Sequence, residues 1–105
     1  MDIKNEIESR FEDMTAVRRH IHRYPELSFQ EEKTKIYIYD QIKNLPLDIK
    51  RDVGGNGLSA RLQVNDNYKT VALRADFDAL PIQEENDVDY KSEFEGVMHA
   101  CGHDS

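Results

Sequence analysis

The stretch Thr70–Asp78, with the sequence TVALRADFD, joins an uninterrupted apolar run to a polar end. An apolar run of this length is typical of a strand buried on both faces, in the middle of a sheet. Polar groups at the carboxyl end of such a strand occupy the position where α/β proteins bind ligands. We therefore predict that residues 70–73 form a buried central strand and that Asp76 and Asp78 lie at its functional end.

Two helices are predicted upstream of this strand. Apolar residues recur every three or four positions over residues 3–21, which gives one packing face, and Pro25 ends this helix. Ser28 and Glu31 have the spacing of a capping box, which would start a second helix that runs to about Asn44. Both helices can therefore cover a sheet built from the residues that follow.

Two shorter strands are predicted between the helices and Thr70. Residues 49–53 form a short strand candidate, and the glycine-rich sequence GGNG at 54–57 is typical of a turn. Residues 58–64 alternate apolar and polar side chains, as a strand with one wet face does. Residues 82–105 show little periodicity and predict an extended surface loop. The order of elements predicts an α/β fold in which two helices pack on a small mixed sheet.

Composition restricts the class of protein. The 105 residues suffice for one small domain, and a 33% charged content suits a soluble chain with a modest core. The net charge of −7 opposes general binding to nucleic acid or anionic lipid. No apolar stretch has the length of a membrane span or the form of a signal peptide, so we expect no membrane partner and a cytoplasmic location. The single cysteine excludes an internal disulfide.

The last eight residues, MHACGHDS at 98–105, carry two good metal ligands. The Cys101 thiolate and the His103 imidazole are common ligands of zinc and related metals, and Gly102 allows a backbone that directs both at one ion. The alternative is a buried thiol beside an incidental histidine. A hydrolytic zinc usually has three protein ligands, so the others would come from upstream residues, from a partner or from chain beyond Ser105.

Two other polar clusters have competing interpretations. Asp76 and Asp78 face the same side of an extended segment, where they could bind metal, orient a metal-bound histidine or simply make a turn; taken alone, they favour the turn. His20 and His22 lie about 200° apart on a helix and cannot share an ion. The basic run at 18–23 is therefore predicted to be a solvated helix C-terminus.

Three segments together resemble a known family. RHIHRYPELS at 19–28, LRADFDALPI at 73–82 and MHACGHD at 98–104 resemble the amidohydrolase branch of the aminoacylase and carboxypeptidase metallopeptidase family. This branch includes hippurate hydrolase, bacterial N-acyl-amino-acid amidohydrolases and plant auxin-conjugate hydrolases. Its members are several times longer. The resemblance implies that residues 1–105 are the incomplete N-terminal portion of a zinc-peptidase-like catalytic domain.

The resemblance also implies a function for particular residues. Cys101 and His103 match metal ligands of a two-metal centre, which holds zinc, manganese or cobalt, while Asp76 and Asp78 match the segment that shapes it. The general base, a further acidic ligand and two more histidines would follow Ser105, so no catalytic residue is assigned in this chain. The implied activity is metal-dependent hydrolysis of the amide bond of N-acyl amino acids or small peptides.

We expect the isolated 105-residue chain to bind metal weakly and to lack this activity, because most of the site would be missing. Two other classes remain open. One is a non-catalytic truncated remnant with a free Cys101 and a flexible tail. The other is a small metal-binding or interaction protein whose site is completed by a partner. In every case the uncovered apolar surface favours self-association.

Overall fold

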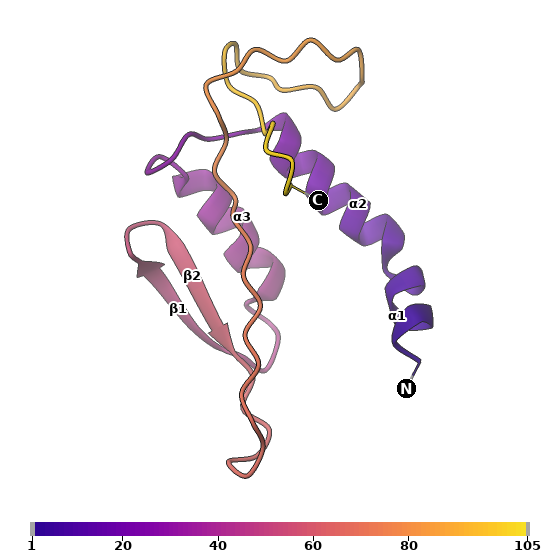
Figure 1. The fold of residues 1–105 in the computed structure, drawn as a ribbon, viewed down its shortest axis with the longest axis vertical. Coiled ribbons are helices and arrows are strands. Elements are labelled where there is room, and N and C mark those ends of the chain that lie inside the picture. The colour runs from indigo at the N-terminus through magenta and orange to yellow at the C-terminus, as the bar shows by residue number, and fades with distance from the viewer. Residues whose placement is uncertain (1, 105) are drawn as a thin grey trace.

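The computed structural model describes residues 2–104, in which three helices precede a two-stranded sheet and a long irregular segment (Figure 1). The elements are α1 (Ile3–Ser9), α2 (Phe11–Arg23), α3 (Glu32–Ile42), β1 (Asp48–Val53) and β2 (Gly57–Arg61). The predicted α/β class is confirmed. Across these residues the sheet contains two strands, which are antiparallel, and the first predicted helix is divided in two. A bilayer-spanning helix, which must be long and apolar, does not occur among residues 2–104.

The division between α1 and α2 lies at Arg10, which leaves helical geometry with φ −104° and ψ 3°. The Ser9 hydroxyl donates to the Glu6 carbonyl at 2.7 Å, and such local bonds compete with the helical pattern. Asp2 caps α1, because its side chain accepts from the Lys4 N–H at 3.0 Å. The predicted stop before Pro25 is confirmed, since α2 ends at Arg23.

The capping box predicted for α3 is wrong, although the helix itself is confirmed. Ser28 Oγ donates instead to Asp78 Oδ2 at 2.5 Å. The cap comes from Glu26, whose carboxylate accepts from the Thr34 N–H at 2.5 Å and from Thr34 Oγ1 at 2.7 Å. Glu26, which precedes the helix in the chain, therefore satisfies free N–H groups at the start of α3. The capping-box pattern, Ser or Thr followed by Glu three residues later, does not identify this kind of cap.

The predicted hairpin is confirmed over β1 and β2. Ile49 pairs with Ala60, and the register shifts between Lys50 and Val53. In the turn, Gly54 and Gly55 have φ values of 63° and 115°. Residues with a Cβ atom rarely adopt this backbone conformation. The second strand ends at Arg61, three residues before the predicted end.

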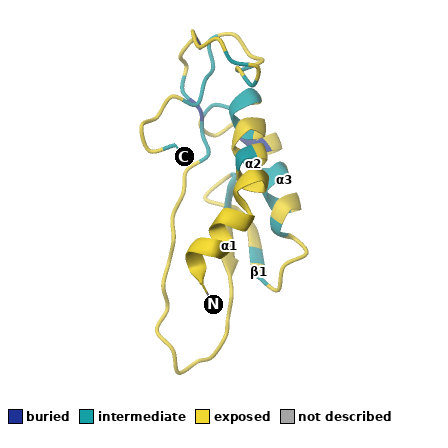
Figure 2. Ribbon diagram, turned by 90° about the vertical axis from the view of Figure 1, so that its right-hand side faces the viewer, coloured by how far each residue is buried: buried dark blue, intermediate teal, exposed yellow. Residues whose placement is uncertain are grey.

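The central strand predicted at residues 70–73 is wrong for the structure as described. Residues 62–78 form no strand, and residues 62–76 run past the other elements as an exposed segment (Figures 1 and 2). Leu73 is 98% exposed and Val71 is 84% exposed. A buried strand needs partners at its edges and layers over its faces, and residues 2–104 provide neither for this segment.

The most buried residues lie where the chain returns to the helices after residue 78. Ala79 is 2% exposed and bridges to Leu27, and its N–H donates to the Glu26 carbonyl at 2.7 Å. Glu84 is 2% exposed and Thr34 4%. Only a few of the described residues are buried, and they lie in the helical region and on this returning segment (Figure 2). The predicted irregular loop from residue 82 onward is confirmed, but Glu84 within it is buried.

Candidate metal centre

The two predicted site segments meet through a backbone bridge. Leu80 donates to the Met98 carbonyl at 2.9 Å, and Met98 donates to the Leu80 carbonyl at 3.0 Å. This antiparallel bridge places the segment that contains Asp78 beside the segment that leads to Cys101. Residues about 20 positions apart in the sequence are thereby brought to one place.

Cys101 and His103 lie close together on a tight surface turn. The Cys101 Sγ atom is 4.0 Å from His103 Nδ1, and both residues are exposed. A tetrahedral zinc ion would hold a sulfur and a nitrogen ligand about 3.6 Å apart. The two donors therefore fit one ion with a small adjustment. Within residues 2–104, His, Cys, Asp and Glu form no group of three or more that could hold a metal ion.

Asp76 and Asp78 do not join this pair. Asp76 is exposed and forms an ion pair with Arg74 at 2.9 Å, while Asp78 accepts the bond from Ser28. Both aspartates line an open hollow of about 560 Å³ between the Ser28–Glu31 turn and the turn of the hairpin. Their role in supporting a metal site stays a prediction.

His99 occupies the buried side of the motif, a position that our reasoning from the sequence left without a role. Its side chain is 7% exposed, and Nδ1 lies 3.9 Å from Asp104 Oδ2. Burial lowers the pKa of His99, and the negative charges of Asp104 and Asp78 oppose this effect without cancelling it. The buried Nε2 atom has no hydrogen-bond partner in the described part of the chain.

Glu84 is the second residue that our reasoning from the sequence missed. Its carboxylate accepts from His22 Nε2 at 3.0 Å, from the Ser92 N–H at 2.7 Å and from Asn86 Nδ2 at 3.1 Å. Burial would raise the pKa of Glu84, but the Ser92 N–H, His22 and Asn86 together hold this pKa below its ordinary value. No local motif pairs residues 62 positions apart, so the sequence offered no signal for this contact.

The contact with Glu84 corrects the interpretation of the basic run at 18–23. His22 has a side chain only 12% exposed, so this residue is not part of a solvated helix end. His20 stacks on Tyr37 with ring centroids 3.9 Å apart, on a different side of α2. His20 and His22 thus contact different partners, Tyr37 and Glu84.

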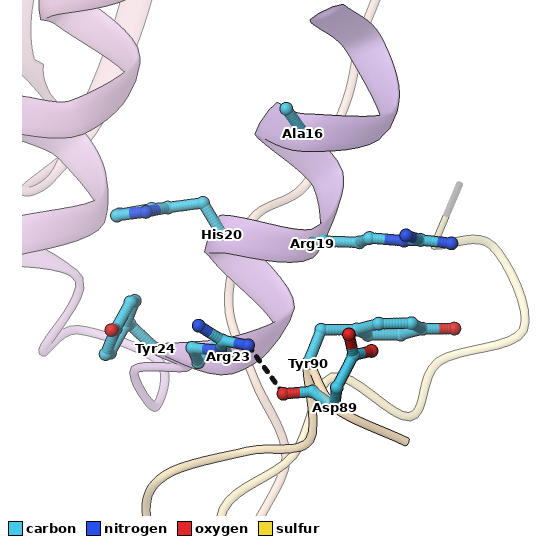
Figure 3. A pocket seen from close by; sticks show the side chains of 7 residues that line it. All are labelled: Ala16, Arg19, His20, Arg23, Tyr24, Asp89 and Tyr90. Carbon is cyan, nitrogen blue, oxygen red and sulfur yellow. Dashed lines mark hydrogen bonds between the residues drawn. The ribbon is translucent and has the colours of Figure 1, made fainter. Parts of the chain in front are cut away.

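A hollow of about 300 Å³ lies between α2 and the loop at residues 89 and 90. Figure 3 shows Arg19 and His20 leaving α2 in opposite directions, with Arg19 above the Tyr90 ring. The Arg19 guanidinium is 4.5 Å from the ring centroid, and Arg23 Nη2 donates to the Asp89 carbonyl at 2.5 Å. Because these arginines are used to hold the loop, we regard the hollow as a packing junction.

Comparison with known proteins first identifies a protein family to which part of the chain is similar. Residues 72–105 match the family described as Peptidase family M20/M25/M40. This range contains both the Asp76 and Asp78 segment and the Cys101 and His103 motif. The resemblance predicted from three sequence segments is confirmed: the chain is similar to metallopeptidases of this family and to proteins described as amidohydrolases.

Individual relatives make the assignment more specific. The chain is 53% identical over 98% of its length to the protein YhaA of Bacillus subtilis, and 46% identical over 98% to an N-acyl-L-amino acid amidohydrolase of Geobacillus stearothermophilus. Among solved structures, a Bacillus subtilis protein described as a dinuclear metal binding peptidase from the M20 family matches 92% of the chain, at 36% identity and a TM-score of 0.82. The chain spans 26%, 28% and 27% of the lengths of these three proteins.

Proposed function

We propose that residues 1–105 form the N-terminal portion of the catalytic domain of a metal-dependent amidohydrolase, and that Cys101 and His103 are two of its metal ligands. The observation that carries this proposal is the 4.0 Å separation of Cys101 Sγ and His103 Nδ1 on one exposed turn. The match of residues 72–105 to a metallopeptidase family supports it independently. Asp76 and Asp78 shape the surroundings in this proposal, since the Leu80–Met98 bridge brings their segment to the motif.

The chemistry supplied by two bound divalent ions, zinc, manganese or cobalt, is activation of water and polarisation of the amide carbonyl. The part played by this chain is to hold the ions. The Cys101 thiolate and the His103 imidazole are a soft and a borderline donor, a combination that suits zinc better than manganese, which prefers oxygen donors. We assign no general base within residues 1–105.

The substrate class that we propose is an N-acyl amino acid or a small peptide, because relatives of the chain include an N-acyl-L-amino acid amidohydrolase and a peptidase. The net charge of −7 argues against nucleic acid as a partner. A cytoplasmic location remains part of this proposal.

We propose further that the 105-residue chain alone has no appreciable amidohydrolase activity. Two ligands leave a hydrolytic metal short of the usual three, and the described residues contain no third ligand beside the pair. The test is incubation of the metal-loaded chain with an N-acyl amino acid. We expect no turnover above a metal-only control. Metal-dependent turnover that disappears in Cys101→Ser would contradict this proposal.

Binding of metal by the pair is tested separately by calorimetry with zinc. We expect a binding free energy much smaller than the roughly 10 to 16 kcal/mol of complete structural zinc sites. The binding should be lost in both Cys101→Ser and His103→Ala. An unchanged titration in His103→Ala would remove this histidine from the site.

A second candidate function is a metal-binding chain whose site a partner completes. The exposure of Cys101 and His103 favours it, because a partner could reach both donors. Hydrogen exchange separates these two functions: a completed site predicts that the protection of amides within residues 83–104 increases when metal and partner are both present. A truncated, non-catalytic remnant predicts no increase when they are added.

A further inference from the structure

The turn that carries the metal ligands is closed by two hydrogen bonds between the same two residues. The Asp104 N–H donates to the Cys101 carbonyl at 3.1 Å, and the Cys101 N–H donates to Asp104 Oδ2 at 3.2 Å. Together these bonds form a ring around Gly102 and His103. A free turn containing glycine would sample many conformations, so each bond restricts the relative placement of the two ligands.

The same carboxylate also connects the turn to the buried part of the molecule. Asp104 Oδ2 lies 3.9 Å from Nδ1 of His99, whose side chain is 7% exposed. His99 follows Met98 directly, and Met98 is held to Leu80 by two backbone bonds. The exposed turn therefore lies, at Asp104, beside a segment whose backbone is fixed.

We propose that Asp104 is a positioning residue: its carboxylate accepts the Cys101 N–H, faces His99, and so preorganises Cys101 and His103 for a divalent cation. This inference rests on the proposed function of the pair as metal ligands. Groups that hold a metal ligand in place without touching the metal typically contribute 10- to 100-fold in affinity. The acceptor oxygen is the feature that matters here, because the bond to Cys101 needs an acceptor and not a charge.

The experiment is a titration of the 105-residue chain with Co²⁺, followed by the absorption of the thiolate-to-cobalt band. We compare the parent chain with Asp104→Ala, Asp104→Asn and Asp87→Ala. Asp87 is an exposed aspartate in the loop before the motif, so its replacement makes the same change of charge away from the turn. Far-UV circular dichroism of each variant checks that the helices are retained.

We expect Asp104→Ala to weaken Co²⁺ binding about tenfold or more. Asp104→Asn, which keeps an acceptor oxygen, should stay within about threefold of the parent, and Asp87→Ala should bind like the parent. At saturation the band should have the same position and intensity in all four proteins, because the ligands are the same.

Two outcomes would overturn the inference. In the first, Asp104→Ala binds Co²⁺ as tightly as the parent chain does. In the second, Asp104→Asn binds Co²⁺ as weakly as Asp104→Ala, which would show that the charge of Asp104, and not its acceptor oxygen, supports binding. A parent chain that shows no thiolate band at all would instead contradict Cys101 as a ligand, so the two failures are distinct.

Discussion

The loop at residues 79–98 and the segment at 62–76 are both irregular, yet they differ completely in their contacts. Glu84 in the first is 2% exposed and its carboxylate accepts bonds from three residues. Leu73 in the second is 98% exposed. The loop around Glu84 is thus ordered by specific hydrogen bonds, while the apolar run at 70–73 has nothing to pack against within residues 2–104.

The largest expected effect is loss of the partner of Glu84. In His22→Ala the buried carboxylate loses its side-chain donor from α2, and we expect the free energy of unfolding to fall by about 3 kcal/mol. Urea unfolding measures this change. His20→Ala on the same helix removes only aromatic stacking, so it should cost clearly less. Equal losses in the two variants would show that Glu84 does not depend on His22.

A smaller effect is expected from the cap of α3. Glu26→Ala leaves the Thr34 N–H and hydroxyl without their acceptor, and we expect a loss of about 1 to 2 kcal/mol in the free energy of unfolding. Glu26→Gln, which retains an acceptor oxygen, should recover part of it. Urea unfolding measures the stability of both variants. If the amides of α3 lose no protection from hydrogen exchange in Glu26→Ala, the assignment of this cap is wrong.

The pH dependence of stability should reflect the same loop. The pKa of Glu84 is lower in the folded chain than its ordinary value of 4.5, so the unfolded chain binds a proton more readily. The stabilisation is therefore fully present above about pH 4.5 and is lost as the pH falls through the lower, folded pKa. Urea midpoints from pH 7 to pH 3 measure this decline. The decline of the urea midpoint with falling pH should be shallower in Glu84→Gln than in the parent chain. An identical decline in the two proteins would show that other carboxylates cause it.

The smallest effect on stability is expected in the exposed segment at residues 62–76. Leu73→Ser should change the free energy of unfolding by no more than about 0.5 kcal/mol, because the side chain is already in water. It should instead reduce self-association, which sedimentation measures over a range of concentrations. A destabilisation close to that of His22→Ala would show that the segment is packed in solution, and the contrast between the two regions would then fail.

Much of the fold could be predicted because its signals are local. The apolar periodicity before Pro25, the glycines at 54 and 55 and the alternation after residue 57 each act over a few residues, and the corresponding helices and hairpin are present. The same applies to the candidate site. The types and spacing of Cys101 and His103 can be read from the sequence, and in the turn that they occupy Sγ lies 4.0 Å from Nδ1.

Errors arose where a local signal needed a distant partner. The apolar run at 70–73 has the composition of a central strand, but a strand forms only when neighbouring strands supply hydrogen bonds and covering layers. Ser28 has a capping residue's chemistry, yet it bonds to Asp78, 50 positions away. His22 lies in a basic run that suggests solvent exposure, and its contacts with the distant residues Glu84 and Tyr90 bury it.

The helical pattern, the hairpin turn, the excess of negative charge and the identity of the Cys101 and His103 donors could all be read from the amino-acid sequence. Three features depended on tertiary structure: the burial of Glu84 against His22, the bridge between Leu80 and Met98, and the position of Asp104 beside His99. The physical reason is that propensity and spacing act along the chain. A buried carboxylate or a backbone bridge forms only when folding brings its donors and acceptors together through space.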